Sequence, residues 1–279
     1  MGVLFAIASA ALYGTGDFFG GMAAKRLSIW VVVPVSGLFG LLTACAATAV
    51  LSPGVPLRSD LELGALAGIV GGGAIACLYR GLAIARMSVV APITAVVAAV
   101  VPVVYGIAIG ERPALGAFIG IVLALVAVAL VSASAQEDVS GKPEPASAGL
   151  ALALAAGLGF GLLYVILART SHAMWPLVAA RTTSTLAVGT LAIVTRRFGS
   201  PRPALGSTAM SGVFDMFGNV LYLLALRHTL VAIAAVVTSL YPASTVLLAR
   251  LVLRERLTSV QWMGVACAGA GIVLIGVSS

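Results

Sequence analysis

Residues 113–133 read PALGAFIGIVLALVAVALVSA, a stretch without a single charged side chain. About 20 apolar residues in a helix cross the hydrocarbon core of a bilayer. Inside lipid every backbone polar group must be hydrogen-bonded within the chain, and a helix achieves this by itself. The stretch therefore predicts a transmembrane helix, and the charged residues Glu111 and Arg112 mark the loop before it.

The composition of the whole chain is that of a protein whose solvent is lipid. Of the 279 residues 61% are hydrophobic and 9% are charged, and the mean hydropathy is +1.15. Soluble domains carry about 25% charged residues, so this chain has too few charges to cover a soluble surface. The net charge of +7 is scattered between apolar runs, without an aromatic-interleaved basic face. We expect a lipid bilayer around the protein and no nucleic-acid partner.

Charges, prolines and polar clusters divide the sequence into ten apolar segments. The segments cover residues 2–22, 30–51, 61–84, 88–109, 113–133, 149–169, 175–195, 204–226, 230–252 and 258–277. The third and fourth, and the eighth and ninth, are separated by short breaks, so nine or eleven helices are the alternatives. No Lys or Arg precedes the first segment, which we therefore expect to be a helix and not a cleaved signal peptide. The predicted fold is an all-α integral membrane protein with ten transmembrane helices.

A polar, proline-bearing linker at residues 134–148 separates two similar halves, residues 1–133 and 149–279. Several short sequences recur in order at a nearly constant offset. Among them, Leu78-Tyr79 recurs as Leu221-Tyr222, and Glu111-Arg112 recurs as Glu255-Arg256. Five helices per half is an odd number, so the second half must enter the membrane from the opposite face. This predicts two inverted five-helix repeats, an architecture of secondary transporters that bind substrate between the repeats.

Each half carries a proline before a charged motif that precedes its last helix. The first copy reads Gly110-Glu111-Arg112 after Pro92 and Pro102, and the second reads Arg254-Glu255-Arg256-Leu257 after Tyr241-Pro242. In these features the chain resembles the EamA-type transporters of the drug/metabolite transporter superfamily. The second copy departs from the family pattern because it lacks the glycine. The resemblance implies a multi-pass protein of the cytoplasmic (inner) membrane, with a central cavity lined by the first, third, fourth, sixth, eighth and ninth helices.

Ionisable side chains inside the predicted spans indicate where such a cavity lies. A charge at the bilayer centre costs about 2.5–3.5 kcal/mol on insertion scales, so it usually faces a cavity or a partner. Asp215 lies near the middle of its segment, with Ser211, Asn219 and Tyr222 on the same helical stripe. We interpret this stripe as a cavity wall that binds substrate or a proton. The alternative is a hydrogen-bond network between helices.

Three further charged residues lie within spans. Asp17 shares a helix face with Tyr13 among several glycines, and the alternative to a functional role is an acidic side chain near the membrane surface. Arg181 is expected to pair with Asp17 or Asp215 or to bind an anionic group, unless it extends toward the surface. Arg80 lies near the end of its segment, where such an extension is favoured.

The paired motifs Glu111-Arg112 and Glu255-Arg256 sit in loops, where a carboxylate can cap the helix that follows. We expect them to be structural or gating elements. No catalytic set, phosphate loop or metal-ligand spacing stands out, so no metal or cofactor is expected. The sequence predicts a non-enzymatic secondary transporter, a monomer or homodimer, that exports or exchanges a small molecule, with Asp17 or Asp215 as candidates for proton coupling. The alternatives are an integral-membrane enzyme or sensor and a non-transporting membrane subunit.

An even number of spans places both termini on one side. The basic residues concentrate in the loops on the other side, so the positive-inside rule places the termini outside. The family resemblance implies instead that both termini are cytoplasmic.

Overall fold

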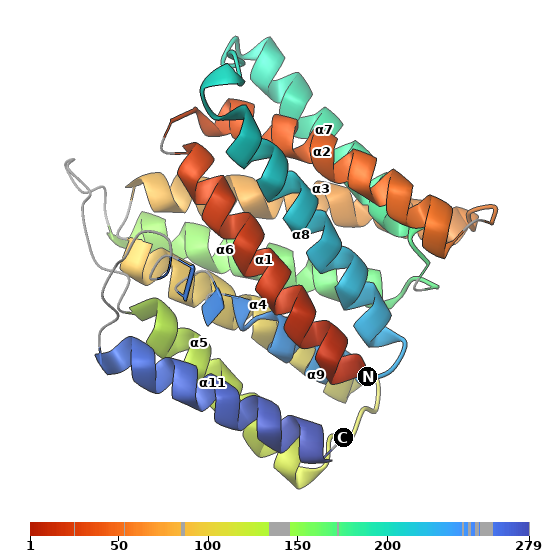
Figure 1. Ribbon diagram of the computed structural model, residues 1–279, viewed down its shortest axis with the longest axis vertical. Coiled ribbons are helices and arrows are strands. Elements are labelled where there is room, and N and C mark those ends of the chain that lie inside the picture. The colour runs from red at the N-terminus through yellow and green to blue at the C-terminus, as the bar shows by residue number, and fades with distance from the viewer. Residues whose placement is uncertain are drawn as a thin grey trace.

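The computed structural model describes most of the chain as a bundle of helices (Figure 1). It describes residues 1–24, 26–52, 54–84, 87–133, 146–171, 173–241, 243–244, 247–248, 251 and 259–278. The long helices are α1 (Gly2–Ala24), α2 (Ile29–Leu51), α3 (Arg58–Ile84), α4 (Met87–Ala108), α5 (Leu115–Ala133), α6 (Ala146–Ala168), α7 (Trp175–Val194), α8 (Leu205–Leu226) and α11 (Ser259–Ser278). A 3-10 turn, η1 (Arg202–Ala204), precedes α8, and α9 covers Val231–Thr238. No strand occurs within these described ranges.

Most helices fall where the apolar segments predict them, to within a few residues. The largest difference is in the segment predicted at residues 230–252, where α9 ends at Thr238 and a turn follows at Ser239 and Leu240. Pro242 has no backbone N–H to donate to the Thr238 carbonyl oxygen, so a regular helix cannot continue there unchanged. Helix α6 begins at Ala146, inside the predicted linker, because alanine continues a helix readily once the prolines have ended. The linker residues 134–145 and the motif residues Glu255 and Arg256 lie outside the described residues.

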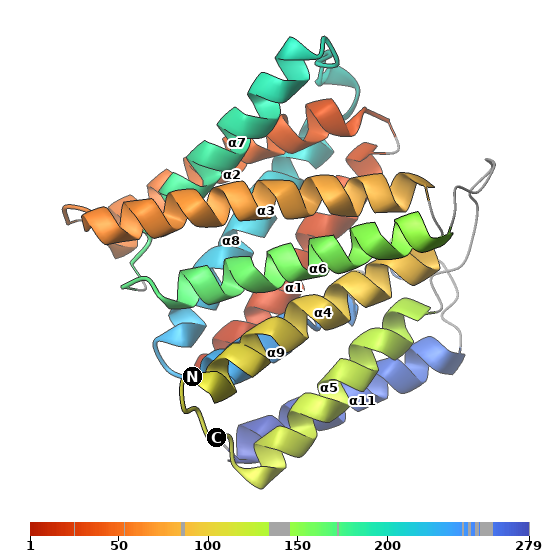
Figure 2. The ribbon, with the colours of Figure 1, turned by 180° about the vertical axis from the view of Figure 1, so that it is seen from behind.

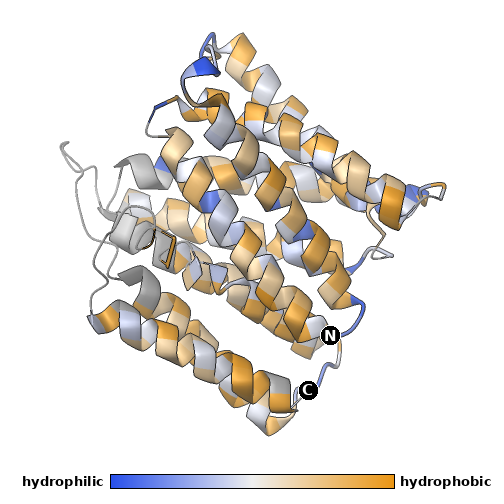
Figure 3. Cartoon of the chain, viewed as in Figure 1, coloured by the Kyte–Doolittle hydropathy of each residue, from blue (hydrophilic) through white to orange (hydrophobic). Residues whose placement is uncertain are grey.

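Length and hydropathy single out helices that can cross a membrane. Within the described residues, 6 helices are long and apolar enough, namely α1, α2, α3, α6, α7 and α8 together with η1. Shorter apolar helical stretches occupy Ile93–Ala108, Leu115–Leu130 and Trp262–Ile275. Hydrophobic colours run along the helices, and hydrophilic colours concentrate at the connections between them (Figure 3). This distribution is expected of helices whose sides face lipid and whose ends face water.

The helices form two layers with a pair closing each edge (Figures 1 and 2). In one layer α1 lies between α8 and α9, and in the other α6 lies between α3 and α4. The α2–α7 pair contacts α8 and α3 at one edge, and the α5–α11 pair contacts α4 and α9 at the other. Both termini are marked at the same end of the bundle, which we call the terminal end. This placement agrees with the sequence prediction that the termini share a side.

Glycines allow the closest helix crossings. A Cβ on Gly120 of α5 would lie 2.8 Å from the Gly271 carbonyl oxygen of α11, and a Cβ on Gly271 would lie 2.9 Å from the Gly120 carbonyl oxygen. A Cβ on Gly16 of α1 would lie 3.0 Å from the Asp215 backbone nitrogen of α8. In lipid, helices associate through such close packing because burial of apolar surface gives no driving force. The α1–α8 crossing brings Asp17 alongside Asp215.

The helix ends follow local sequence signals. The Ser28 side chain caps α2 by accepting a hydrogen bond from the Trp30 backbone N–H at 3.3 Å. Pro176 occupies the first turn of α7, where its missing N–H costs nothing. Gly110 ends the α4 region with φ +94°, a left-handed conformation that favours glycine.

Candidate functional site

An ion pair between α7 and α8 is the centre of the candidate site. Arg181 donates from Nη2 to Asp215 Oδ2. The two side chains are 19% and 36% exposed, so the pair is only partly shielded. Of the two partners that the sequence allows for Arg181, the structure selects Asp215. Burial penalises each charge, and mutual pairing in a low-dielectric setting offsets that penalty.

Gly40 of α2 makes this pairing possible. Helix α2 contacts both α7 and α8, so the Arg181 side chain crosses α2 to reach Asp215. A Cβ on Gly40 would lie 3.1 Å from Arg181 Nε and 3.2 Å from the Gly212 carbonyl oxygen. The arginine side chain therefore passes close over a glycine on its way to Asp215, and a larger residue at position 40 would require it to shift.

Asp17 supplies a second carboxylate. It lies on α1 near enough to Asp215 for the two acidic groups to interact electrostatically. Its side chain is exposed, although Gly16 beside it is buried against α8. An exposed carboxylate this close to the ion pair is expected where helices border an open space. Two carboxylates and one guanidinium give the site an excess of negative charge, which favours a cation or a proton.

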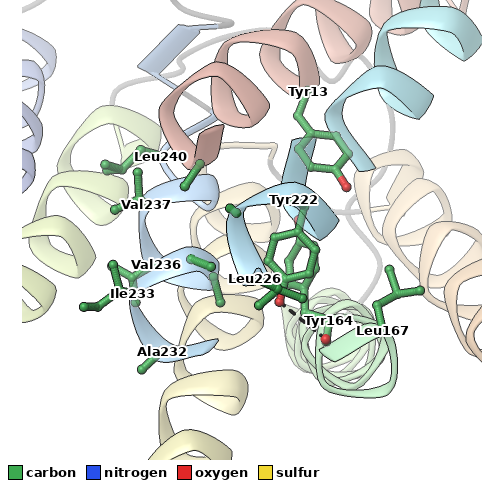
Figure 4. Close-up of a cluster of buried hydrophobic side chains, with 14 of the residues drawn as sticks. Tyr13, Tyr164, Leu167, Tyr222, Leu226, Ala232, Ile233, Val236, Val237 and Leu240 are labelled. Carbon is green, nitrogen blue, oxygen red and sulfur yellow. Dashed lines mark hydrogen bonds between the residues drawn. The ribbon is translucent and has the colours of Figure 1, made fainter. Parts of the chain in front are cut away.

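Tyrosines from three helices gather in the middle of the bundle, and two of them come from opposite layers (Figure 4). Tyr164 of α6 and Tyr222 of α8 have ring centroids 4.8 Å apart, and the Tyr222 hydroxyl donates to the Tyr164 carbonyl oxygen at 3.4 Å. Tyr13 of α1 meets Tyr241 edge to face at 6.5 Å. Aromatic rings provide apolar contact area and electron-rich faces that attract cations. The rings are buried against one another, so the cluster forms an aromatic junction between α1, α6 and α8.

Gly218 seats Tyr13 against α8. A Cβ on Gly218 would lie 2.9 Å from the Tyr13 ring. On the same face of α1, the Ser9 hydroxyl donates to the Gly218 carbonyl oxygen at 2.7 Å. These contacts fix the position of Tyr13 along α8, one helical turn from Asp17.

The predicted stripe on α8 meets different neighbours at different levels. Ser211 faces α1, where a Cβ on Gly20 would lie 2.8 Å from its hydroxyl oxygen. Asn219 donates to the Asp215 carbonyl oxygen of its own helix at 2.9 Å, and Tyr222 is fully buried against α6. Asp215 is the member of the stripe with an ion pair. Substrate contact by Ser211, Asn219 and Tyr222 stays a prediction.

Glu111 caps a helix, but not the one that follows it in the chain. Its carboxylate accepts hydrogen bonds from the Val231 and Ala232 backbone N–H groups at 2.7 and 3.1 Å. These residues begin α9, in the other half of the protein. The prediction of a cap on the next helix is therefore wrong, because the turn after α4 folds toward α9, which packs on α4. Arg112 beside it is exposed.

A second carboxylate joins the two halves at the terminal end. Asp60, 3% exposed at the start of α3, accepts a hydrogen bond from the Ser171 backbone N–H at 2.9 Å and another from the Ser171 hydroxyl. The Ser52 hydroxyl oxygen accepts from the Met174 backbone N–H at 3.1 Å. The α2–α3 connection is thus tied to the α6–α7 connection.

Several site residues escaped the sequence analysis. Tyr164 and Tyr241 carried a weak signal, since each is a polar-tipped ring inside an apolar segment. Gly40 and Asp60 carried none that distinguished them from other glycines or loop acids. Among the described residues, no group of three or more His, Cys, Asp or Glu side chains is placed to hold a metal ion.

Comparisons with known proteins bear on the family and the fold. The sequence profile of the EamA-like transporter family matches residues 1–133 and again residues 147–277. The chain belongs to the EamA-like transporter family. Members of this family are transporters, and the apolar helices described above make this EamA-like chain a multi-pass membrane protein.

The fold of this EamA-like protein also occurs in solved structures. One, titled "Crystal structure of protein", superposes with a TM-score of 0.74 at 15% sequence identity, covering 100% of this chain and 99% of the other. At this identity the likeness establishes the fold alone. A search of curated proteins gives no significant match.

Proposed function

We propose that this protein is a secondary transporter that exports or exchanges a small, positively charged or zwitterionic metabolite across the cytoplasmic membrane by alternating access. The observation that carries the proposal is the partly exposed Arg181–Asp215 ion pair with Asp17 beside it. A structural ion pair needs no third charge. An additional exposed carboxylate inside a membrane bundle is costly unless it meets a cation, a proton or water.

We propose two inverted five-helix repeats and ten spans, and the contacts between helices support the relation of the two halves. When α1, α2, α3 and α4 are exchanged with α6, α7, α8 and α9, the observed pairs map onto one another. The α1–α8 contact becomes α6–α3, α2–α8 becomes α7–α3, and α1–α9 becomes α6–α4. The family profile likewise matches each half. Such a repeat gives a protein two related conformations, each open to one side, with the site between the halves.

The chemistry of the site suggests how binding would be coupled to the conformation. A cationic group entering next to Asp17 and Asp215 competes with the Arg181 guanidinium for carboxylate oxygens. Helix α2 packs against both α7 and α8, and the Arg181–Asp215 pair adds a direct side-chain link between them. Loss or weakening of the pair would remove that direct link. A ligand shifts a conformational equilibrium only by its differential affinity for the two states, and this exchange of partners provides such a difference.

The proposal is tested by transport into proteoliposomes. Purified protein is reconstituted, and a panel of labelled amines, amino acids and neutral metabolites is assayed for uptake and for counterflow. We expect accumulation of positively charged or zwitterionic compounds, and loss of this accumulation in Asp17→Asn protein that reconstitutes normally. Glu62→Gln is the matched control, because Glu62 is an exposed carboxylate that pairs with Arg58 outside the site. Equal uptake by the parent and Asp17→Asn proteins would reject the site.

A further inference from the structure

We infer that Glu111 is a latch that closes the terminal end of the bundle by holding the α4–α5 turn to the first turn of α9. The inference rests on the proposed transport function, because a latch has a role only in a protein that opens. It adds the place where the two halves must separate for the terminal end to open.

Helix α9 depends on Glu111 for its N-terminal cap. The residue before the helix, Leu230, provides no side-chain cap. The first N–H groups of a helix lack partners within the helix and require them from elsewhere. Glu111 accepts from Val231 through Oε1 and from Ala232 through Oε2. Both bonds are charge-assisted, and the carboxylate also faces the positive end of the helix dipole.

The backbone of Glu111 is fixed to the end of α4 by two hydrogen bonds. The Gly110 N–H donates to the Ile107 carbonyl oxygen at 3.0 Å, and the Glu111 N–H donates to the Gly106 carbonyl oxygen at 2.9 Å. This pair of bonds is a Schellman motif, completed by the positive φ of Gly110. Gly106 leaves room for the acid, since a Cβ there would lie 3.0 Å from Glu111 Cδ. A movement of α4 away from α9 would therefore break the hydrogen bonds between Glu111 and the first turn of α9.

Helix α9 connects the latch to the candidate site. Residues 232–238 are buried (Figure 4). The chain then leads to Tyr241, whose ring contacts the Tyr13 ring. At about 1.5 Å per residue, the capped first turn and the far end of this segment are roughly 10 Å apart. Glu111 is also close enough to Tyr222 for an electrostatic interaction. A shift of the tyrosines on substrate binding would therefore strain the capped end of α9.

Two buried hydroxyl groups lie at the far end of α9. Thr238 Oγ1 and Ser239 Oγ are buried and have no hydrogen-bond partner within the structure as described. Buried hydroxyls without partners are unfavourable, so a displaced α9 that satisfies them recovers part of the free energy lost with the cap. The latch then sets the balance between a closed terminal end and an open one.

Thiol accessibility in lipid nanodiscs tests the latch without any substrate. The native Cys45, Cys77 and Cys267 are replaced by alanine, and a cysteine is introduced at Ala235, which is fully buried in α9. The rate of alkylation by a membrane-impermeant maleimide is then compared with and without Glu111→Ala. Loss of two charge-assisted bonds is expected to raise the rate about tenfold or more.

Two controls separate local opening from general loosening. A cysteine at Ala23, buried in the small cluster with Val32 and Ala204 at the opposite end, should keep its parental rate. Glu62→Gln removes an exposed carboxylate at the terminal end and should change neither rate. An unchanged rate at residue 235, or an equal rise at residues 23 and 235, would overturn the inference.

A milder variant covers the case in which Glu111→Ala does not accumulate in membranes. Glu111→Gln keeps the size and one acceptor oxygen but loses the charge, and we expect about a threefold rise in labelling at residue 235. No rise with this variant would equally reject the latch. Because labelling needs no substrate, a protein that labels as expected yet moves no compound would contradict the transport proposal alone.

Discussion

The Arg181–Asp215 pair offers a test that separates stability from transport. Asp215→Asn removes one charge and leaves the Arg181 guanidinium, 19% exposed, without its carboxylate. Removing one partner of a fully buried pair costs about 3–5 kcal/mol, whereas exposed pairs contribute about 0–1 kcal/mol. Since Asp215 is 36% exposed, we expect an intermediate loss of about 1–3 kcal/mol. For a chain of this size that lowers the apparent Tm by roughly 2–10 °C.

The double variant Arg181→Gln/Asp215→Asn should be more stable than Asp215→Asn alone. Two neutral amides leave no unpaired charge in the bundle, so at least half of the loss should be recovered, a coupling of about 1 kcal/mol or more. The assay is thermal unfolding in detergent followed by size-exclusion chromatography, at a single heating rate because such unfolding is often irreversible. Arg58→Gln/Glu62→Gln, at an exposed pair, should leave Tm unchanged.

Transport by the same proteins then tests the function of the pair. Asp215→Asn and the double variant should both reach parental membrane levels and both fail to transport, although their stabilities differ. Additive losses of stability in the double variant would show that the ion pair contributes no coupling. Transport by the double variant at the parental rate would refute the functional assignment and leave the pair as helix packing.

Three further outcomes follow from the geometry. Asp17→Asn should keep the parental Tm, because the side chain is exposed, but should weaken substrate binding about tenfold or more in an equilibrium binding assay; unchanged affinity would contradict a charge contact. Asp60→Ala removes both acceptors of the α6–α7 connection and should destabilise by about 2–4 kcal/mol, measured as a lowered Tm. Gly218→Ala places a Cβ 2.9 Å from the Tyr13 ring and should cost about 1–3 kcal/mol, whereas Gly21→Ala, with open space around it, should be neutral in the same melt; equal effects would show that α1 is not seated on α8.

The positions of the helices followed from the sequence because hydropathy is a property of each segment by itself. Residues 113–133 have no charged side chain, and α5 occupies Leu115–Ala133. The caps at the helix ends are also local, since Ser28 and Gly110 act on the backbone within a few residues of themselves. The ionisable residues inside spans were also identifiable, because their cost in lipid depends on type and depth.

The partners of those residues were decided by the tertiary structure. Arg181 had two possible acidic partners, and its choice of Asp215 depends on the gap that Gly40 leaves on a third helix. Glu111 lies in the turn between α4 and α5, yet it caps α9, whose N–H groups the α4–α9 packing brings within hydrogen-bond distance. Hydrogen bonds and ion pairs act over a few ångströms, and those distances are set by glycine-lined helix crossings between segments far apart in the chain. The sequence by itself determined which segments are apolar helices and which charges lie among them, while the packing of the helices decided which of those charges meet.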